Sequence, residues 1–368
     1  MHWRGWGDPE RATPLPEPVV ELLRQALGVQ PTTPPVDMTE VRLPERSLPG
    51  PAYQALLEAV GADNVQSDPE ARIRHTRGKS TADLLRIRAG DAVDAPDAVV
   101  LPGSHAEVVE VLEVSSQHRV AVVPFGGGTS VVGGLAPHAR SYAGVVAMDL
   151  RRLDLLLDLD AESRVATLES GLLAPRAEAL LRERGFTLGH FPQSYECASI
   201  GGFAATRSSG QASAGYGRFD EMVVQMRVAT PTGTLELGRA PKSAAGPDLR
   251  QLVLGSEGAF GVITSVAVQV RPQPAASGYE GWRFASFDAG TAATRSRWAA
   301  TAAAEPSYPT TSRQPDCGSP PPICPGSASP IAVSASSDSR STAGTGPSCA
   351  SRRIAAVPAS KLANRQPS

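Results

Sequence analysis

Short apolar runs separated by turn residues recur along the first 285 residues, and one group of them forms a clear unit. The run Ala98–Leu101 ends at a Pro-Gly pair, and apolar residues at helical spacing follow over 108–112. Ser104 stands three residues before Glu107, which is the spacing of a capping box at the start of a helix. Because a second apolar run follows at Val120–Val123, the pattern predicts a β-α-β unit.

The same pattern predicts helices and strands on both sides of this unit. We expect helices at 19–27, 51–60, 175–184 and 249–254, where apolar residues recur at helical spacing. We expect strands at 145–150, 164–169, 223–229, 234–237 and 262–270. The tetrapeptide Thr230-Pro231-Thr232-Gly233 has the composition of a hairpin turn between two of these strands. A β-α-β unit together with a hairpin indicates an α+β fold with a mixed sheet.

Composition changes sharply near residue 286. The last 83 residues contain 16 serines, 11 prolines and only seven large aliphatic residues or phenylalanines. So few apolar residues cannot form a packed core for this segment, and we predict a disordered tail at 291–368. Three of the four cysteines lie there at spacings that fit no zinc site. We expect unpaired thiols and no metal site.

Charge and hydropathy exclude several classes of protein. The formal net charge is −2, from 35 basic and 37 acidic residues, so there is no general attraction to nucleic acid or to an anionic membrane. No apolar run approaches the roughly 18 residues of a transmembrane helix. The N-terminus lacks the apolar stretch of a signal peptide. We therefore expect a cytoplasmic protein without a transmembrane segment, and we leave peripheral membrane contact and the oligomeric state open.

The segment with the most specific chemistry follows the second strand of the β-α-β unit. Its sequence is Pro124-Phe125-Gly126-Gly127-Gly128-Thr129-Ser130. Three consecutive glycines allow backbone N–H groups to converge without obstruction by Cβ atoms, and the two hydroxyls add donors. Together they predict an anion-binding nest for a pyrophosphate, with a flexible turn as the alternative.

Two familiar phosphate motifs do not fit this sequence. A Gly-x-Gly-x-x-Gly fingerprint would need a glycine where Thr129 or Val131 stands. The tripeptide Gly78-Lys79-Ser80 resembles the end of a P-loop, but Ile73 occupies the position of the required first glycine. We therefore interpret Gly78-Lys79-Ser80 as an ordinary turn.

Two further glycine-rich segments occur downstream, at Ser199–Gly210 and Gly255–Ile263. Each combines small residues with hydroxyl groups beside an ordered element. Three such loops in one domain favour an extended dinucleotide that is held by backbone groups from several sides.

In these residues the sequence resembles the FAD-binding domain of the vanillyl-alcohol oxidase / p-cresol methylhydroxylase (PCMH) superfamily, and within it the alkylglycerone-phosphate synthases. Pro124–Ser130 resembles the pyrophosphate loop of the family, and Gly189–Ser199 leads into the second loop. Residues 205–208 resemble the segment near the flavin ring, and Glu257–Ile263 resembles the last cofactor segment. The resemblance implies a PCMH-type fold of two subdomains with mixed sheets.

The resemblance also implies a set of cofactor-binding residues spread over these loops. They are Pro124, Phe125, Gly126, Gly127, Gly128, Thr129, Ser130, Gln193, Ser194, Ser199, Gly202, Ala205, Thr206, Arg207, Ser208, Glu257, Gly258, Gly261, Val262 and Ile263. Gln193 and Cys197 depart from the family, which usually has an acidic and an aromatic residue there. For Arg207 a surface role stays open, and His190 either lines the flavin site or is structural.

The expected cofactor is FAD, bound non-covalently. Covalent members of the superfamily carry their attachment residue beside the glycines of the first loop, and this chain has no histidine there.

The implied function is acyl-to-alkyl exchange on dihydroxyacetone phosphate, a step of ether-lipid synthesis, with small-molecule or lipid-like substrates. In this family a cap domain after the FAD-binding domain contributes a histidine cluster. All six histidines of this chain lie at or before His190, so that cluster is absent and we expect impaired catalysis. Two alternatives stay open, an FAD-dependent oxidase or dehydrogenase of a hydroxy acid and a non-catalytic FAD-binding fragment. The sequence identifies no catalytic residue.

These observations predict four parts of the chain. We expect an N-terminal helical and extended segment at 1–90, the FAD-binding domain at 91–273, the start of a cap domain at 274–290, and the tail at 291–368. We interpret the abrupt change of composition as a frameshift near Thr291–Arg295.

Overall fold

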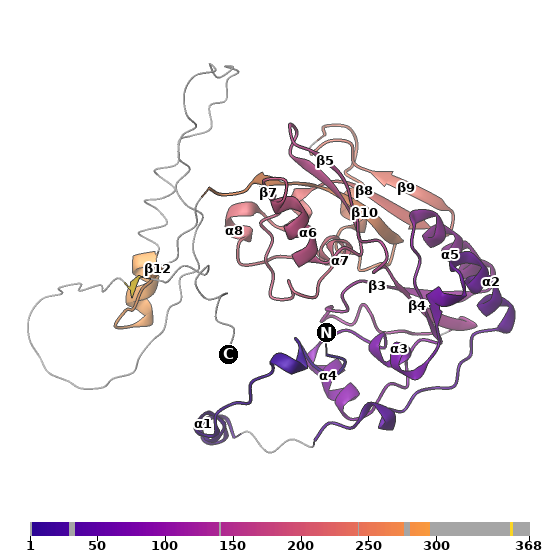
Figure 1. Cartoon of the computed structure of the whole chain (residues 1–368), viewed down its shortest axis with the longest axis horizontal. Helices are drawn as coiled ribbons and strands as arrows, with labels where there is room; N and C mark the ends of the chain where they lie inside the picture. Colours follow the sequence, from indigo (N-terminus) through magenta and orange to yellow (C-terminus); the bar gives the residue numbers. More distant parts are fainter. Residues whose placement is uncertain are drawn as a thin grey trace, which may run out of the picture. The chain divides into compact units, whose positions relative to one another are not determined.

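The computed structural model of the chain describes residues 2–28, 34–139, 141–241, 243–275, 280–294 and 354–355. Contacts divide the chain into two compact units, Met1–Gln273 and Pro274–Ser368. In the first unit, helices pack against two large sheets (Figure 1). In the second unit, β12 (Glu280–Gly281) pairs with β13 (Ile354–Ala355), and residues 287–294 are helical.

The first sheet has the strand order β1-β2-β4-β3. Its strands are β1 (Val65–Gln66), β2 (Ala98–Val100), β3 (Val120–Phe125) and β4 (Gly144–Asp149). Strands β2 and β3 run parallel to β4, which lies between them, whereas β1 pairs antiparallel with β2. Helix α5 (His105–Gln117) connects β2 to β3 and packs with α2 (Gly50–Val60). The predicted β-α-β unit is confirmed.

Local sequence explains where α5 begins. The Ser104 hydroxyl accepts a hydrogen bond of 3.2 Å from the backbone N–H of Glu107, as the spacing predicts. The Glu107 carboxylate accepts from the backbone N–H of Gly103 at 2.7 Å. Val108 and Val111 of this helix are fully buried, and burial of such a side chain contributes roughly 1.5–3 kcal/mol. The cap and the apolar face together fix α5 over the sheet.

The second sheet is antiparallel throughout, with the order β5-β6-β10-β8-β9. Its strands are β5 (Leu156–Asp160), β6 (Val165–Glu169), β8 (Val223–Thr230), β9 (Gly233–Leu237) and β10 (Val262–Gln269). The predicted hairpin turn joins β8 to β9, and the Thr230 hydroxyl donates to the carbonyl of Gly233 at 2.8 Å. The mixed and antiparallel sheets confirm the predicted α+β class.

A core of large side chains lies between the second sheet and helices α6 (Ala174–Arg182) and α7 (Ile200–Thr206). Phe203 of α7 and Phe219 are fully buried there, with ring centroids 5.3 Å apart. Helix α7 lies inside the second glycine-rich segment, Ser199–Gly210. Its packing in the core therefore fixes the residues of that segment on either side of the helix.

His105 links helix α5, which packs on the first sheet, to the second sheet. Its ring nitrogens lie 2.7 Å from the hydroxyl of Thr264 on β10 and 2.7 Å from that of Thr234 on β9. The first turn of α5 is thus tied to the second sheet.

The remaining elements of the chain are short. They are η1 (Pro9–Arg11), α1 (Glu17–Leu27), η2 (Met38–Glu40), η3 (Ala62–Asn64), α3 (Pro69–Arg74), α4 (Thr81–Arg88), β7 (Phe186–Thr187), α8 (Ser213–Tyr216), α9 (Phe219–Met222), α10 (Arg250–Val253) and β11 (Arg271–Pro272). None of the helices in the described ranges is long and apolar enough to cross a membrane. Of the predicted disordered tail at 291–368, the structure describes only 291–294, which are helical, and 354–355, which form β13; the rest lies outside the described residues. Nothing in the structure tests the predicted frameshift near Thr291–Arg295.

Candidate functional site

The first glycine loop leaves the end of β3 and packs directly on the segment before α7. A Cβ atom at Gly126 would overlap the Ser199 hydroxyl, and one at Gly127 would overlap the carbonyl oxygen of Cys197 and lie 3.0 Å from the Ala198 Cα. Glycine is therefore required at both positions. The sequence predicted both loops, and the structure brings them into contact.

The second loop is organised by the start of α7. The Ser199 side chain is buried and accepts a hydrogen bond of 3.2 Å from the backbone N–H of Gly202, so it caps the helix. The sequence suggested a glycine-rich loop from Ser199, and most of that segment, Ile200–Thr206, is helical instead. Small residues allow this helix to lie close to its neighbours. A Cβ atom at Gly201 would overlap Ser170.

The third loop closes on the first and on the end of α7. The backbone N–H groups of Gly255 and Glu257 donate to the carbonyls of Ala204 and Ala205, at 3.1 and 3.0 Å. The Ser130 hydroxyl donates to the Glu257 carboxylate at 3.2 Å. The three predicted loops therefore meet in one place.

Arg207 ends α7 in a left-handed conformation, with φ of 49°. Its guanidinium donates to the carbonyls of Leu254 and Gln251, at 2.9 and 3.1 Å, and to the Asp220 carboxylate at 3.1 Å. These bonds tie α7 to α10 and α9. The charged group of Arg207 therefore holds the second and third loops together.

The other predicted residues occupy several environments. Gln193 and Thr206 are exposed, and Ser194 is half-buried, with its carbonyl accepting from Cys197 and Ala198 at 2.9 Å each. Val262 and Ile263 are buried in β10, where their side chains pack in the two cores.

His190 lies beneath the second loop with 2% of its surface exposed. Its Nε2 is 3.0 Å from the Ser208 hydroxyl, and its ring stands edge-on to Phe203 at 4.6 Å between centroids. Burial lowers the pKa of His190 to about 4, so the ring is neutral. Its Nδ1 has no hydrogen-bond partner among the described residues.

A buried contact between His75 and Asp149, which the sequence interpretation missed, supports the first loop. In the His75 ring, Nδ1 lies 2.7 Å from the Ala71 carbonyl oxygen and Nε2 lies 2.8 Å from the Asp149 carboxylate. The same ring lies against Phe125, with centroids 4.5 Å apart. Burial works to raise the pKa of Asp149, but hydrogen bonds from His75 and Arg151 outweigh it and lower the pKa below its usual value. An acidic residue at the end of an apolar strand was the available signal.

Gly78-Lys79-Ser80 also differs from the expected ordinary turn. The Ser80 hydroxyl caps α4 by accepting from the Asp83 N–H at 3.1 Å. The Lys79 N–H donates to the Ser130 carbonyl at 2.7 Å. The tripeptide thus contacts the end of the first glycine loop.

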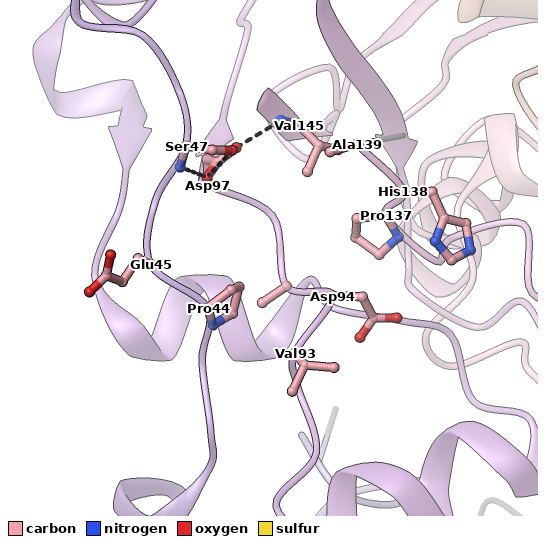
Figure 2. A pocket seen from close by; sticks show the side chains of 11 residues that line it. Pro44, Glu45, Ser47, Val93, Asp94, Asp97, Pro137, His138, Ala139 and Val145 are labelled. Carbon is pink, nitrogen blue, oxygen red and sulfur yellow. Dashed lines mark hydrogen bonds between the residues drawn. The ribbon is translucent and has the colours of Figure 1, made fainter. Parts of the chain in front are cut away.

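A separate open cavity of about 500 Å³ lies beside β4 (Figure 2). Asp97 on its wall accepts hydrogen bonds from the backbone N–H groups of Ser47 and Val145, at 2.6 and 2.8 Å. Its lining residues, Pro44, Glu45, Ser47, Val93, Asp94, Ala95, Asp97, Pro137, His138, Ala139 and Val145, include none from the three loops.

Comparison with known proteins identifies the type of domain to which these loops belong. Residues 96–238 match the family described as FAD binding domain. An alkyldihydroxyacetonephosphate synthase of Trypanosoma brucei brucei is 37% identical over 311 residues, which are 78% of this chain and 51% of that protein. A solved structure of alkyldihydroxyacetonephosphate synthase matches with a TM-score of 0.73 at 33% identity, over 82% of this chain and 59% of that one. Residues 96–238 therefore form an FAD-binding domain, and the chain is similar to the alkyldihydroxyacetonephosphate synthases.

Two further proteins are similar over part of the chain. A solved structure of p-cresol methylhydroxylase with substrate bound shares the fold, with a TM-score of 0.53 at 20% identity, over 64% of this chain and 46% of that one. A mitochondrial D-lactate dehydrogenase (cytochrome) of Arabidopsis thaliana is 34% identical over 59% of this chain and 36% of its own length. The chain spans about half the length, or less, of the curated relatives named here.

The residues where the loops meet fit the FAD of the matched domain family. The glycine backbone at Gly126 and Gly127 and the hydroxyl of Thr129 are the donor types that a pyrophosphate requires, whereas the Ser130 hydroxyl donates to Glu257. Two buried polar atoms beside the loops, Ser256 Oγ and His190 Nδ1, have no partner among the described residues. Both atoms are covered by the surrounding protein, so they add unsatisfied polar groups next to the loops and not an open ligand contact.

Proposed function

We propose that this chain binds FAD non-covalently, with the pyrophosphate on the backbone of the first loop. The observation that carries the proposal is the contact of all three loops through Gly127, Ser199 and Glu257. Side chains have no room at Gly126 and Gly127, while the backbone N–H groups of Gly126–Ser130 and the Thr129 hydroxyl supply donors for an anion. The residues proposed to bind FAD are the twenty that the family resemblance implies.

The surroundings of the first loop support non-covalent binding. His75 lies against Phe125, but both of its ring nitrogens are already engaged in hydrogen bonds, with the Ala71 carbonyl and with the Asp149 carboxylate. Neither nitrogen is available to bond with a flavin carbon. His190 is buried under Phe203 and has one nitrogen beside Ser208.

We further propose that the FAD-binding unit belongs to an alkylglycerone-phosphate synthase, which exchanges the acyl group of an acylated dihydroxyacetone phosphate for a fatty alcohol. FAD supplies the reactive ring for this chemistry when it is bound. The loops of this chain bind and orient that ring, and the buried contact His75–Asp149 and the partly exposed pair Arg207–Asp220 hold the loops in place. The substrates are small and lipid-like, and the proposed compartment is the cytoplasm.

The domain limits belong to the same proposal. We assign 91–273 to the FAD-binding domain, 1–90 to a supporting N-terminal segment and 274–290 to the start of a cap. The histidine-rich part of the cap has no counterpart in this chain, because no histidine follows His190. We therefore propose that catalysis is impaired.

A second function has support from the dehydrogenase relative, which matches over the same FAD-binding part. It is oxidation of a hydroxy acid, in which the bound cofactor accepts a hydride.

One set of assays distinguishes these functions. Purified protein is first precipitated with acid, and the flavin is measured in the supernatant and in the pellet. Flavin found only in the supernatant supports non-covalent FAD, and flavin in the pellet contradicts it. Acyl dihydroxyacetone phosphate and a fatty alcohol are then supplied and the alkyl product is measured, while anaerobic bleaching with D-lactate or glycolate tests for a dehydrogenase. Bound FAD with neither activity identifies a binding fragment.

A further inference from the structure

Lys79 is a buried amine at the end of the first glycine loop. It is 8% exposed, and its backbone N–H donates to the Ser130 carbonyl at 2.7 Å. A Cβ atom at the preceding Gly78 would overlap that same carbonyl oxygen. The Gly78-Lys79 peptide therefore lies in direct contact with the loop. Nothing in the P-loop-like sequence of this tripeptide predicted that contact.

The Lys79 ammonium has only neutral acceptors. Its Nζ donates to the backbone carbonyls of His2 and Trp3, at 3.0 and 2.8 Å. An ammonium group has three hydrogens, so one of them has no acceptor among the described residues. No carboxylate in the described ranges lies within ion-pairing distance of Nζ. A buried ammonium that is held only by neutral carbonyls is less stable than one paired with an anion, so an anion that reached Nζ would stabilise it.

The charged and titratable groups around Lys79 come from every neighbouring element. They are His2 in the N-terminal segment, Arg74 in α3, Asp83 in α4 and Cys197 before α7. The Asp83 carboxylate is already engaged, because it accepts from the N–H and the hydroxyl of Ser80. Burial, followed by repulsion from Arg74, lowers the pKa of Lys79 to about 8, although Cys197 and Asp83 oppose this shift.

We propose that Lys79 is a cofactor-binding residue whose ammonium group neutralises the pyrophosphate of FAD at the Ser130 end of the first loop. This inference rests on the proposed binding of FAD. Backbone N–H groups at glycines supply hydrogen bonds but no full charge, and a pyrophosphate carries negative charge. Lys79 is one of three lysines in the sequence, and it supplies the missing positive charge from the side of the N-terminal segment.

Two consequences follow from a titrating amine at this position. The affinity for FAD falls as the pH rises through the pKa of Lys79, because only the ammonium form attracts the anion. By linkage, a bound anion raises the pKa of Lys79. ADP carries the same pyrophosphate without the flavin, so it produces the same two effects.

The first experiment compares wild type, Lys79→Met, Lys79→Arg and the control Arg86→Met by FAD and ADP affinity. Arg86 is an exposed cation on the neighbouring helix α4, where it pairs with Asp91. At about pH 7, Lys79→Met weakens binding roughly ten- to hundredfold and the control does not. At about pH 9.5, Lys79→Arg binds more tightly than wild type, because a guanidinium stays protonated. Wild-type affinity for Lys79→Met overturns the inference.

A second measurement does not depend on whether the variants fold. The wild-type chain is labelled with ¹³C at the Cε of lysine, and the resonance that titrates near the value for a buried amine is followed with and without ADP. We expect its midpoint to rise when ADP binds. An unchanged midpoint with ADP bound overturns the role of Lys79 alone. Failure of the wild type to bind either FAD or ADP overturns the proposed function as well.

Discussion

The hydroxyl of Ser130 donates a hydrogen bond of 3.2 Å to the carboxylate of Glu257, and this bond joins loops that lie 127 residues apart in the sequence. Glu257 adopts φ of 50°, an uncommon conformation for a residue with a side chain. The backbone of Glu257 is held at the same time by the Ala205 carbonyl at 3.0 Å. One acidic residue therefore fixes the third loop against both the first loop and the end of α7.

Glu257→Ala will weaken FAD binding without unfolding the protein. The substitution removes one hydrogen bond between loops, worth about 1 kcal/mol, which corresponds to a loss of roughly fivefold in affinity. Glu257→Gln keeps an acceptor oxygen for Ser130 and will retain most of the affinity. Titration of FAD fluorescence measures both variants. Equal losses in Ala and Gln would mean that the charge of Glu257, and not its bond to Ser130, matters.

Gly127→Ala will disrupt the first loop, because the added Cβ overlaps the Cys197 carbonyl. Overpacking of this kind costs roughly 1–3 kcal/mol, so we expect FAD affinity to fall about tenfold to hundredfold. Gly50→Ala is the matched control, since a Cβ there meets nothing within 4 Å. Affinity is again measured by FAD titration, with circular dichroism to monitor folding. An unaltered affinity in Gly127→Ala would remove the first loop from the proposed site.

His190 predicts a specific pH dependence of stability. Its pKa is 6.5 when it is exposed and about 4 in the folded protein, where burial disfavours the charged ring. Between these values the unfolded chain binds a proton that the folded chain does not, so the free energy of unfolding decreases as the pH falls from 6.5 towards 4.

Asp149 contributes to the pH dependence of stability in a more acidic range. Its pKa is lowered below 3.8 in the folded protein, so the stabilising effect of its charge is lost only as the pH falls through that lower value.

His190→Gln tests this dependence by removing the titrating ring while keeping a polar group beside Ser208. Urea unfolding of the FAD-free protein, repeated across the acidic range, gives the free energy of unfolding for both chains. We expect the variant to be less stable near neutral pH and to lose less stability on acidification. Parallel curves for variant and wild type would show that His190 does not titrate in this way.

The sequence predicted best those strands whose buried residues form a continuous apolar run. Every residue of β4 is buried. In β3 and β10 almost no position is fully exposed, so the strands appear in the sequence as apolar runs without polar alternation. Strand β5 was missed because it carries Asp158 and Asp160, has mostly exposed positions and pairs along one edge with β6. Helix α7 was hidden by its own glycines, which favour loops in isolation but permit close packing here.

In the candidate site, features encoded by neighbouring residues could be predicted, and contacts between distant residues could not. The three glycine loops could be identified from composition, because glycine is required wherever backbones approach closely. The contacts of Lys79 with Ser130, and of His75 with Asp149, join residues 51 and 74 positions apart. Neither contact has a periodic signal, since each depends on how α3 and α4 are placed beside the first sheet.

A chain that ends at Gln273 will bind FAD as tightly as the whole chain. All three loops and both cores lie within the unit Met1–Gln273, and the N–H of Gln273 donates to the Gly185 carbonyl at 2.8 Å, which ties the end of that unit to the segment after α6. A chain that ends at Gly261 is the contrasting variant. It lacks β10, which lies between β6 and β8, and it will not fold. Circular dichroism and FAD titration distinguish the two chains. Loss of FAD from the folded Gln273 chain would show that residues beyond this unit complete the cofactor site.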